Sequence, residues 1–179
     1  LMERQKTGRG QEVTTSLLGT ALAFMSPTLI EQAVLASNRA PLGNRSSGAA
    51  PADLFKTRDG WILIQVVGQP LFRRLAQLIE EPDWLDDPRF ADDLSRGEHG
   101  ALISARVGEW CAARGRAQAL EALAAARIPA GPVLSPAETL DHPHVQAMGL
   151  LRQVTSADAP RPTPIVGVPI SLSANPGSI

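Results

Sequence analysis

The segment LFKTRDGWILIQVV, residues 54–67, sets the sheet around which the rest of the chain is expected to fold. Asp59-Gly60 is a favoured tight turn, and it separates an extended run at 54–57 from a second run at 61–67. We therefore expect an antiparallel hairpin. The second run is largely unbroken in its apolar character, which predicts a strand buried on both faces.

Apolar spacing after the hairpin predicts helices mixed with short strands. Gln69-Pro70 is a typical helix start, because proline is tolerated in the first turn of a helix. Further helices are expected at about 101–114 and 117–127, and short strands at 131–134 and 150–155. This mixed order predicts an α/β or α+β lobe.

A long apolar segment precedes the hairpin. A helix is expected from about Thr15 to about Ala36, with a broad apolar face and a kink at Pro27. Residues 16–30 are too few to span a bilayer, so we interpret them as part of a buried helix and expect no membrane contact. Residues 38–51 are rich in glycine, serine, asparagine and proline, and loops of this length are usually functional or linking.

The composition favours a packed globular protein and excludes several classes of partner. The chain has 179 residues, enough for one domain and part of a second, with 44% hydrophobic and 20% charged residues. A formal net charge of -1 gives no positive excess for binding nucleic acid or an anionic membrane surface. The single cysteine, Cys111, excludes an intrachain disulfide, and we interpret it as a core residue of a cytoplasmic protein.

Conventional catalytic and metal-binding signatures are absent from the sequence. It contains no GxGxxG fingerprint, no phosphate loop ending in GK[ST] and no GxSxG elbow. His142 and His144 lack a well-spaced set of partner ligands, so no metal site is expected. The acidic pairs at 86–87 and 92–93 are interpreted as solvated surface rather than as an acid/base pair.

Short segments in order along nearly the whole chain resemble one enzyme superfamily. They are TGRGQEV (7–13), SLL (16–18), GNR (43–45), AP (50–51), FKTRDGW (55–61), DPRF (87–90), RIPAGPV (127–133), DHP (141–143) and MG (148–149). Together they resemble the family III CoA-transferases, a superfamily that includes formyl-CoA transferase, carnitine CoA-transferase and α-methylacyl-CoA racemase. Each segment alone is weak, and their shared order carries the resemblance.

The resemblance implies a two-domain fold and a particular dimer. Members combine a large Rossmann-like domain with a smaller α+β domain, and two subunits thread through each other as an interlocked homodimer. Residues 1–40 would be a helix and outgoing linker of the large domain, 41–150 the small domain, and the proline-rich residues 151–179 an extended return linker. The expected fold class is therefore α/β, in the form of the CoA-transferase family III fold.

The resemblance also implies nucleophilic catalysis by a carboxylate. In the transferases an aspartate attacks an acyl-CoA thioester, and CoA opens the mixed anhydride to give an aspartyl-CoA thioester, which passes CoA to the acceptor acid. That aspartate would precede Leu1, so no catalytic nucleophile is expected in this chain, which alone should be inactive. The expected substrates are an acyl-CoA and a carboxylic acid. No permanently bound cofactor is expected, because coenzyme A enters as part of the substrate.

Residues near the reaction are implied by the same resemblance. A small-domain loop covers the nucleophile in formyl-CoA transferase, and it matches Ser46, Ser47, Gly48, Ala49 and Ala50 of this chain. Small side chains allow backbone N–H groups to approach a developing oxyanion closely. Two further residues, Gln69 and Leu17, are expected as possible neighbours of the substrate.

Two alternatives stay open beside the transferase. An α-methylacyl-CoA racemase-type isomerase needs acid/base groups at the substrate α-carbon, and one racemase carboxylate matches Gln69, whose neutral amide cannot act as a base. A racemase aspartate also falls at or near Ser47. Both departures favour a transferase. Outside the enzymes, the chain would be a non-catalytic dimerisation or binding domain.

Overall fold

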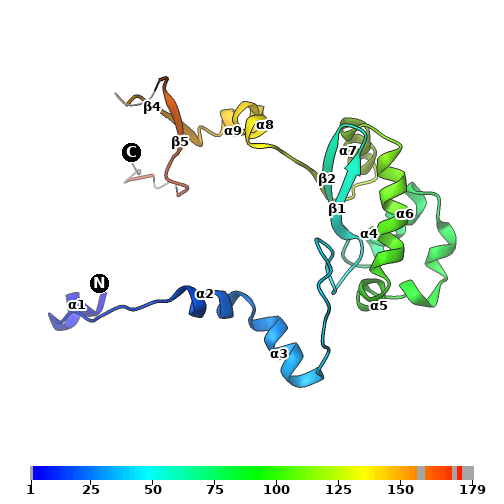
Figure 1. Ribbon diagram of the computed structural model, residues 1–179, viewed down its shortest axis with the longest axis horizontal. Coiled ribbons are helices and arrows are strands. Elements are labelled where there is room, and N and C mark those ends of the chain that lie inside the picture. The colour runs from blue at the N-terminus through cyan, green and yellow to red at the C-terminus, as the bar shows by residue number, and fades with distance from the viewer. Residues whose placement is uncertain (1, 157–159, 171–172, 175–179) are drawn as a thin grey trace. The chain divides into compact units, whose positions relative to one another are not determined.

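The computed structural model describes residues 2–156, 160–170 and 173–174, and it divides into two compact units (Figure 1). The first unit is Leu1–Pro41 and the second is Leu42–Ile179. The mixture of helices and small antiparallel sheets along the described residues agrees with the predicted α/β class. The division into large-domain residues 1–40, small-domain residues 41–150 and a return linker at 151–179 stays a prediction.

The described part of the first unit consists of helices α1 (Met2–Thr7), α2 (Leu17–Phe24) and α3 (Ser26–Leu35). Gly8 ends α1 with a φ of +71°, a left-handed conformation that favours glycine, and its N–H donates to the Arg4 carbonyl at 2.8 Å. Ser16 begins α2, because its Oγ accepts a hydrogen bond from the Gly19 N–H at 3.0 Å.

The prediction of one kinked helix from about Thr15 to Ala36 is wrong. The chain forms α2 and α3 instead, with axes bent by 63° at Met25. Pro27 has no N–H, and within a continuous helix its ring would clash with the carbonyl of Ala23. In the first turn of a new helix neither problem arises, so α3 begins at Ser26.

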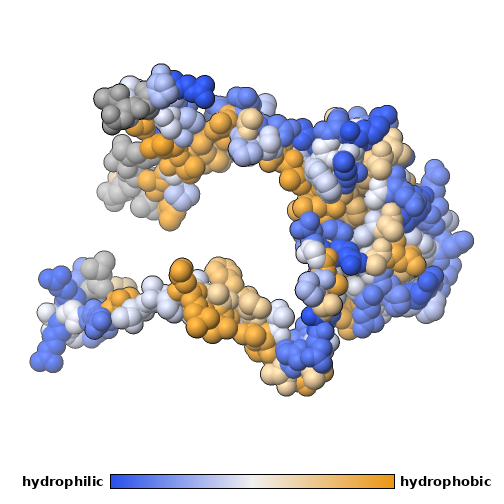
Figure 2. Space-filling model, viewed as in Figure 1, coloured by the Kyte–Doolittle hydropathy of each residue, from blue (hydrophilic) through white to orange (hydrophobic). Residues whose placement is uncertain are grey.

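Helices α2 and α3 are also exposed rather than buried, contrary to the prediction. None of their residues is buried, and Figure 2 shows apolar side chains across both helices. The described part of the first unit holds three short helices, which are too few to cover so broad an apolar face. No single helix among the described residues is long and apolar enough to cross a membrane. Taken together, the bent pair of α2 and α3 meets the length and composition expected of a membrane-crossing segment.

The second unit is built on a three-stranded antiparallel sheet, which confirms the predicted hairpin. Strands β1 (Ala52–Thr57), β2 (Gly60–Gln65) and β3 (Ala130–Val133) lie in that order. The prediction that the second strand is buried on both faces is wrong, because burial alternates along β2. Ile62 and Ile64 are fully buried, whereas Trp61 and Leu63 are 46% and 45% exposed. Helices therefore cover one face of the sheet only.

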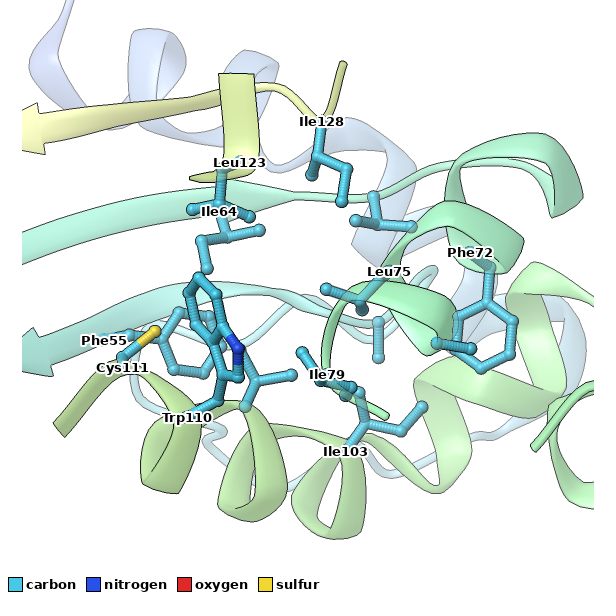
Figure 3. Packing of buried hydrophobic residues seen from close by; sticks show 14 of the residues in the cluster. Phe55, Ile64, Phe72, Leu75, Ile79, Ile103, Trp110, Cys111, Leu123 and Ile128 are labelled. Atoms are coloured by element: carbon cyan, nitrogen blue, oxygen red, sulfur yellow. The ribbon is translucent and has the colours of Figure 1, made fainter. Parts of the chain in front are cut away.

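Helices α4 (Gln69–Leu78), α6 (Gly100–Ala112) and α7 (Arg116–Ala125) supply most of the covering layer. Between α4 and α6 lie the short helices η1 (Pro82–Leu85), η2 (Pro88–Phe90) and α5 (Asp93–Glu98), none of which was predicted as a helix. Figure 3 shows the core, in which Phe55 and Ile64 of the sheet meet Leu75, Ile103 and Trp110 of the helices. Burial of each such side chain contributes about 1.5–3 kcal/mol.

Cys111 belongs to this core, as predicted from the sequence. Its side chain is fully buried beside Phe55 (Figure 3). Desolvation raises the pKa of the thiol to about 12. A thiol in this state is not a nucleophile near neutral pH, so Cys111 serves packing.

The chain continues through α8 (Pro136–Asp141), α9 (Pro143–Ala147) and a two-stranded sheet of β4 (Leu151–Val154) and β5 (Thr163–Val166). The proline-rich end was predicted as an extended connection, and its residues 163–166 instead pair with β4. Pro164 lies opposite Gln153, which a two-stranded sheet tolerates because each strand has an unpaired edge. Residues 157–159, 171–172 and 175–179 of the predicted linker lie outside the described residues.

Arg116 joins the β1–β2 turn to the start of α8. Its backbone N–H donates to Asp59 Oδ1 at 2.6 Å, and its guanidinium donates to Glu138 Oε1. The hydrogen bond from Arg116, with a second from the Ser135 N–H, lowers the pKa of Glu138 from 4.5 to about 2. Since the folded pKa is depressed, the stabilisation from this pair is complete above about pH 4.5 and is lost as the pH falls toward 2.

Replacement of the Arg116 guanidinium should therefore change the pKa of Glu138. In Arg116→Gln, we expect the pKa of Glu138 to rise toward 4.5, because the ion pair and its hydrogen bond are gone. Asp59 provides an internal control, since its largest pKa-lowering contact is the Arg116 backbone N–H, which glutamine keeps. Carbon-detected NMR titration of the carboxyl groups measures both. A Glu138 pKa that stays near 2 in the variant contradicts the assignment.

Candidate functional site

The loop Ser46–Ala50 leads directly into β1, and it has an exposed tip and a buried end. At the tip, the Gly48 N–H donates to Ser46 Oγ at 3.1 Å, and the Ser46 N–H donates to the Ala52 carbonyl at 3.0 Å. At the other end, Ala49 and Ala50 are only 6% and 2% exposed. The loop is thus a compact turn with one end held in the core.

Pro51 continues the anchored end of this loop. It is buried and joined to Ala50 by a cis peptide bond. Its carbonyl accepts a hydrogen bond from the Val66 N–H at 2.8 Å, just beyond the end of β2. The loop and the β2–α4 connection are therefore bound to each other.

Helix α5 lies against this loop. Asp92 caps the helix, because its Oδ1 accepts from the Ser95 N–H at 2.8 Å. The Cα of Gly97 packs against the backbone of Ser47, and Gly100 packs against the Cβ of Ala50. Two glycines three residues apart thus form the surface on which the loop rests.

Arg96 of α5 is a buried cation, with only 1% of its surface exposed. Its Nη1 donates to Gln69 Oε1 at 2.6 Å and to the Phe90 carbonyl at 2.8 Å, and its Nη2 donates to the Asp93 carboxylate. The guanidinium also lies 4.5 Å from the centre of the Phe72 ring. Its Nε is buried without a hydrogen-bond partner among the described residues.

Asp93 completes this polar cluster at the start of α4. Both of its carboxylate oxygens accept from the Gly68 N–H at 2.9 Å. Gly68 has a φ of +86°, a left-handed conformation that favours glycine. The turn between β2 and α4 is therefore held by hydrogen bonds to Asp93 and Arg96 of α5 rather than by a side-chain cap of its own.

The two predicted neighbours of the substrate, Gln69 and Leu17, lie in different units of the chain. Gln69 is half-buried and its amide oxygen is bound to Arg96, so the residue belongs to the same cluster as α5. The loop Ser46–Ala50 and Gln69 are thereby linked to one helix. Leu17 lies at the start of α2 in the first unit, with 93% of its surface exposed.

Among the acidic residues, the interpretation of 92–93 as solvated surface is wrong for Asp93, whose carboxylate is paired with Arg96. Asp87 pairs with Arg89 at 2.7 Å, and hydrogen bonds from Arg89 lower the pKa of Asp87. No group of three histidine, cysteine, aspartate or glutamate residues suited to a metal ion occurs among the described residues. His142 instead caps α9 locally, through a hydrogen bond from the His144 N–H to its Nδ1.

The roles of Asp93, Arg96 and Gly97 were not predicted from the sequence. One signal was present, because aspartate and arginine three residues apart are neighbours on a helix surface. The burial of the arginine and the close approach of the glycine depend on segments far away in the sequence. Neither follows from the local pattern.

Comparison with known proteins gives one consistent family. The family model described as CoA-transferase family III matches residues 1–179. A succinyl-CoA–D-citramalate CoA-transferase of Chloroflexus aurantiacus is 31% identical over 180 residues, which cover 100% of this chain and 44% of that protein. A formyl-CoA:oxalate CoA-transferase of Rhodopseudomonas palustris is 28% identical, over 100% of this chain and 47% of that protein.

Solved structures share the fold. Rv3272 from M. tuberculosis, in its orthorhombic form, has a TM-score of 0.76 at 20% identity, over 99% of this chain and 46% of that one. A CAIB/BAIF family protein from Brucella suis has a TM-score of 0.71 at 25% identity, over 98% of this chain and 45% of that one. These likenesses confirm the predicted fold. The chain spans about half the length of the curated relatives it matches.

Proposed function

The chain belongs to CoA-transferase family III, and from this premise we propose that the full-length protein moves CoA between carboxylic acids. The observation that carries the proposal is the family match over residues 1–179, together with relatives whose names state CoA transfer. An acyl-CoA would be the donor and a free carboxylic acid the acceptor. No permanently bound cofactor is required, since coenzyme A arrives with the donor.

The proposed reaction proceeds through an aspartate that lies outside this chain, before Leu1. Its carboxylate attacks the thioester carbonyl and CoA leaves as a thiolate, which gives a mixed anhydride. The thiolate then attacks the aspartyl carbonyl, releases the donor acid and leaves an aspartyl-CoA thioester. The acceptor carboxylate attacks this thioester, and the returning thiolate cleaves the second anhydride at its acyl carbon. The product acyl-CoA leaves and the aspartate is regenerated.

In this proposal the loop Ser46–Ala50 closes over the reacting carbonyl. Anhydrides and thioesters are lost to hydrolysis if water reaches them, so the reaction needs a covering segment. The exposed tip at Ser46 and Gly48 carries no large side chain that would hold the backbone away from a substrate. The buried end at Ala49 and Ala50 would keep that tip in one place.

A racemase-type acyl-CoA isomerase is the second candidate. It would need a general base near the substrate α-carbon. Gln69 stands where the resemblance puts a racemase carboxylate, and its amide oxygen accepts a hydrogen bond from the buried Arg96. A neutral amide held in this way cannot remove a proton. This favours transfer over isomerisation.

We further propose an interlocked homodimer in the cytoplasm. The supporting observation is the apolar face of α2 and α3, which carries exposed leucine, phenylalanine, methionine and isoleucine side chains. Such a face requires a covering surface in a stable protein. A non-catalytic dimerisation domain would need the same cover, so this face does not by itself favour an enzyme.

A transfer assay tests the proposal. The full-length protein is incubated with succinyl-CoA or formyl-CoA as donor and with oxalate, malate or citramalate as acceptor, in deuterated water. We expect a new acyl-CoA without enrichment of deuterium at the α-carbon of a 2-methylacyl-CoA control. Exchange of that α-proton without CoA transfer would instead support the racemase. If neither occurs, the non-catalytic role stands.

A further inference from the structure

Helix α5 approaches the loop Ser46–Ala50 so closely that only glycine fits at the contact. A Cβ at Gly97 would lie 2.2 Å from the carbonyl oxygen of Ser47, 2.8 Å from its carbonyl carbon and 3.2 Å from the Ala49 nitrogen. These neighbours are backbone atoms, so no side-chain rotation relieves the overlap. Gly97 does not have a positive φ, and it is therefore the close approach that requires glycine.

The other side of α5 is fixed. Arg96 binds Gln69 and the Phe90 carbonyl, and Asp93 binds the Gly68 N–H. The helix therefore cannot move away from the loop without breaking the hydrogen bonds of Arg96 and Asp93 to the residues around the start of α4. A side chain at position 97 would displace the loop rather than the helix.

From this geometry we propose that α5 is a positioning element for the loop Ser46–Ala50, and that Gly97 sets the place of the Ser47 carbonyl. The inference rests on the proposed function, since it takes this loop to cover the reacting thioester. Gly97 would be a positioning residue, because it acts on the reaction through the loop backbone. The buried Arg96 would link the same helix to the β2–α4 turn.

The test compares two glycine substitutions in helices of the full-length protein. In Gly97→Ala the loop backbone must retreat by about 1 Å, and a displacement of that size costs about 100-fold in rate. We expect kcat for CoA transfer to fall by about that factor, while KM for the acyl-CoA changes by no more than about twofold. Gly108→Ala in α6 is the matched control, because nothing lies within 4 Å of a Cβ there, and its kcat should be unchanged.

A second measurement reads the loop directly. Hydrogen–deuterium exchange of a peptide covering 44–52 should be faster in Gly97→Ala than in the unchanged protein, and unchanged in Gly108→Ala. The double variant Ser47→Gly/Gly97→Ala guards against a single variant that fails to fold. Glycine at position 47 allows the carbonyl to turn away from the new methyl group, so about tenfold of the lost kcat should return.

The outcomes separate this inference from the proposed function. If the unchanged protein transfers CoA and Gly97→Ala is as active as Gly108→Ala, the inference is overturned and the function stands. If Gly97→Ala loses activity while exchange of the loop is unaltered, or if Ser47→Gly brings no recovery, the inference is also overturned. If the unchanged protein transfers no CoA from any donor, the proposed function fails.

Discussion

Arg96→Met is expected to lower the free energy of unfolding by about 1–3 kcal/mol, because it leaves the Phe90 carbonyl without its donor and the Asp93 carboxylate without its cationic partner. The substitution keeps much of the volume of the side chain while removing the hydrogen bonds to Gln69 and the Phe90 carbonyl. Equilibrium urea denaturation, followed by tryptophan fluorescence, to which the buried Trp84 and Trp110 contribute, measures the loss. Arg73→Met on the exposed face of α4 is the control and should cost about 0.5 kcal/mol or less.

A second variant distinguishes an unpaired charge from lost packing. Asp93→Asn added to Arg96→Met removes the uncompensated charge while an amide oxygen can still accept from the Gly68 N–H. The double variant should therefore be more stable than Arg96→Met alone. If Arg96→Met costs no more than Arg73→Met, the ion pair does not hold this part of the fold.

Residues 1–179 expressed alone are expected to associate rather than remain monomeric. Large apolar side chains on α2 and α3 are exposed, among them Leu17, Phe24 and Val34 at 93%, 86% and 73%. Apolar patches of this kind drive association in water. Light scattering coupled to size-exclusion chromatography should give a mass of two copies or more.

Charge placed on this face should reverse the association. Leu18→Glu/Leu22→Glu puts two carboxylates four residues apart on α2. Burial of either charge against an apolar partner surface would cost desolvation, so association should weaken. Leu94→Glu, on the exposed part of α5 in the second unit, is the control and should associate like the unchanged chain. A monodisperse monomer of the unchanged chain would show that the α2–α3 face is not a contact surface.

The fold could be predicted where local signals decide the structure. Asp59-Gly60 predicted the turn of the hairpin, and Gln69-Pro70 predicted the start of α4. Two of the errors concern burial, since the exposure of Trp61 and of the α2–α3 face depends on which elements lie opposite. An apolar run does not carry that information.

The candidate site could be predicted only in part. The loop Ser46–Ala50 and Gln69 were expected near the substrate from the resemblance, and the structure links both to α5. The helix itself was missed because its six residues carry no apolar repeat. Its two decisive features, the buried Arg96 and the contact of Gly97 with Ser47, arise between segments about 25 to 50 residues apart.

The most direct test of CoA transfer is the search for its covalent intermediate. The full-length protein is incubated with the donor acyl-CoA, denatured rapidly and digested, and its peptides are analysed by mass spectrometry with and without hydroxylamine. We expect CoA in thioester linkage to an aspartate before Leu1, and hydroxylamine should release the CoA and convert that aspartate to its hydroxamate. A protein that forms the new acyl-CoA without ever carrying such an adduct would contradict the proposed mechanism.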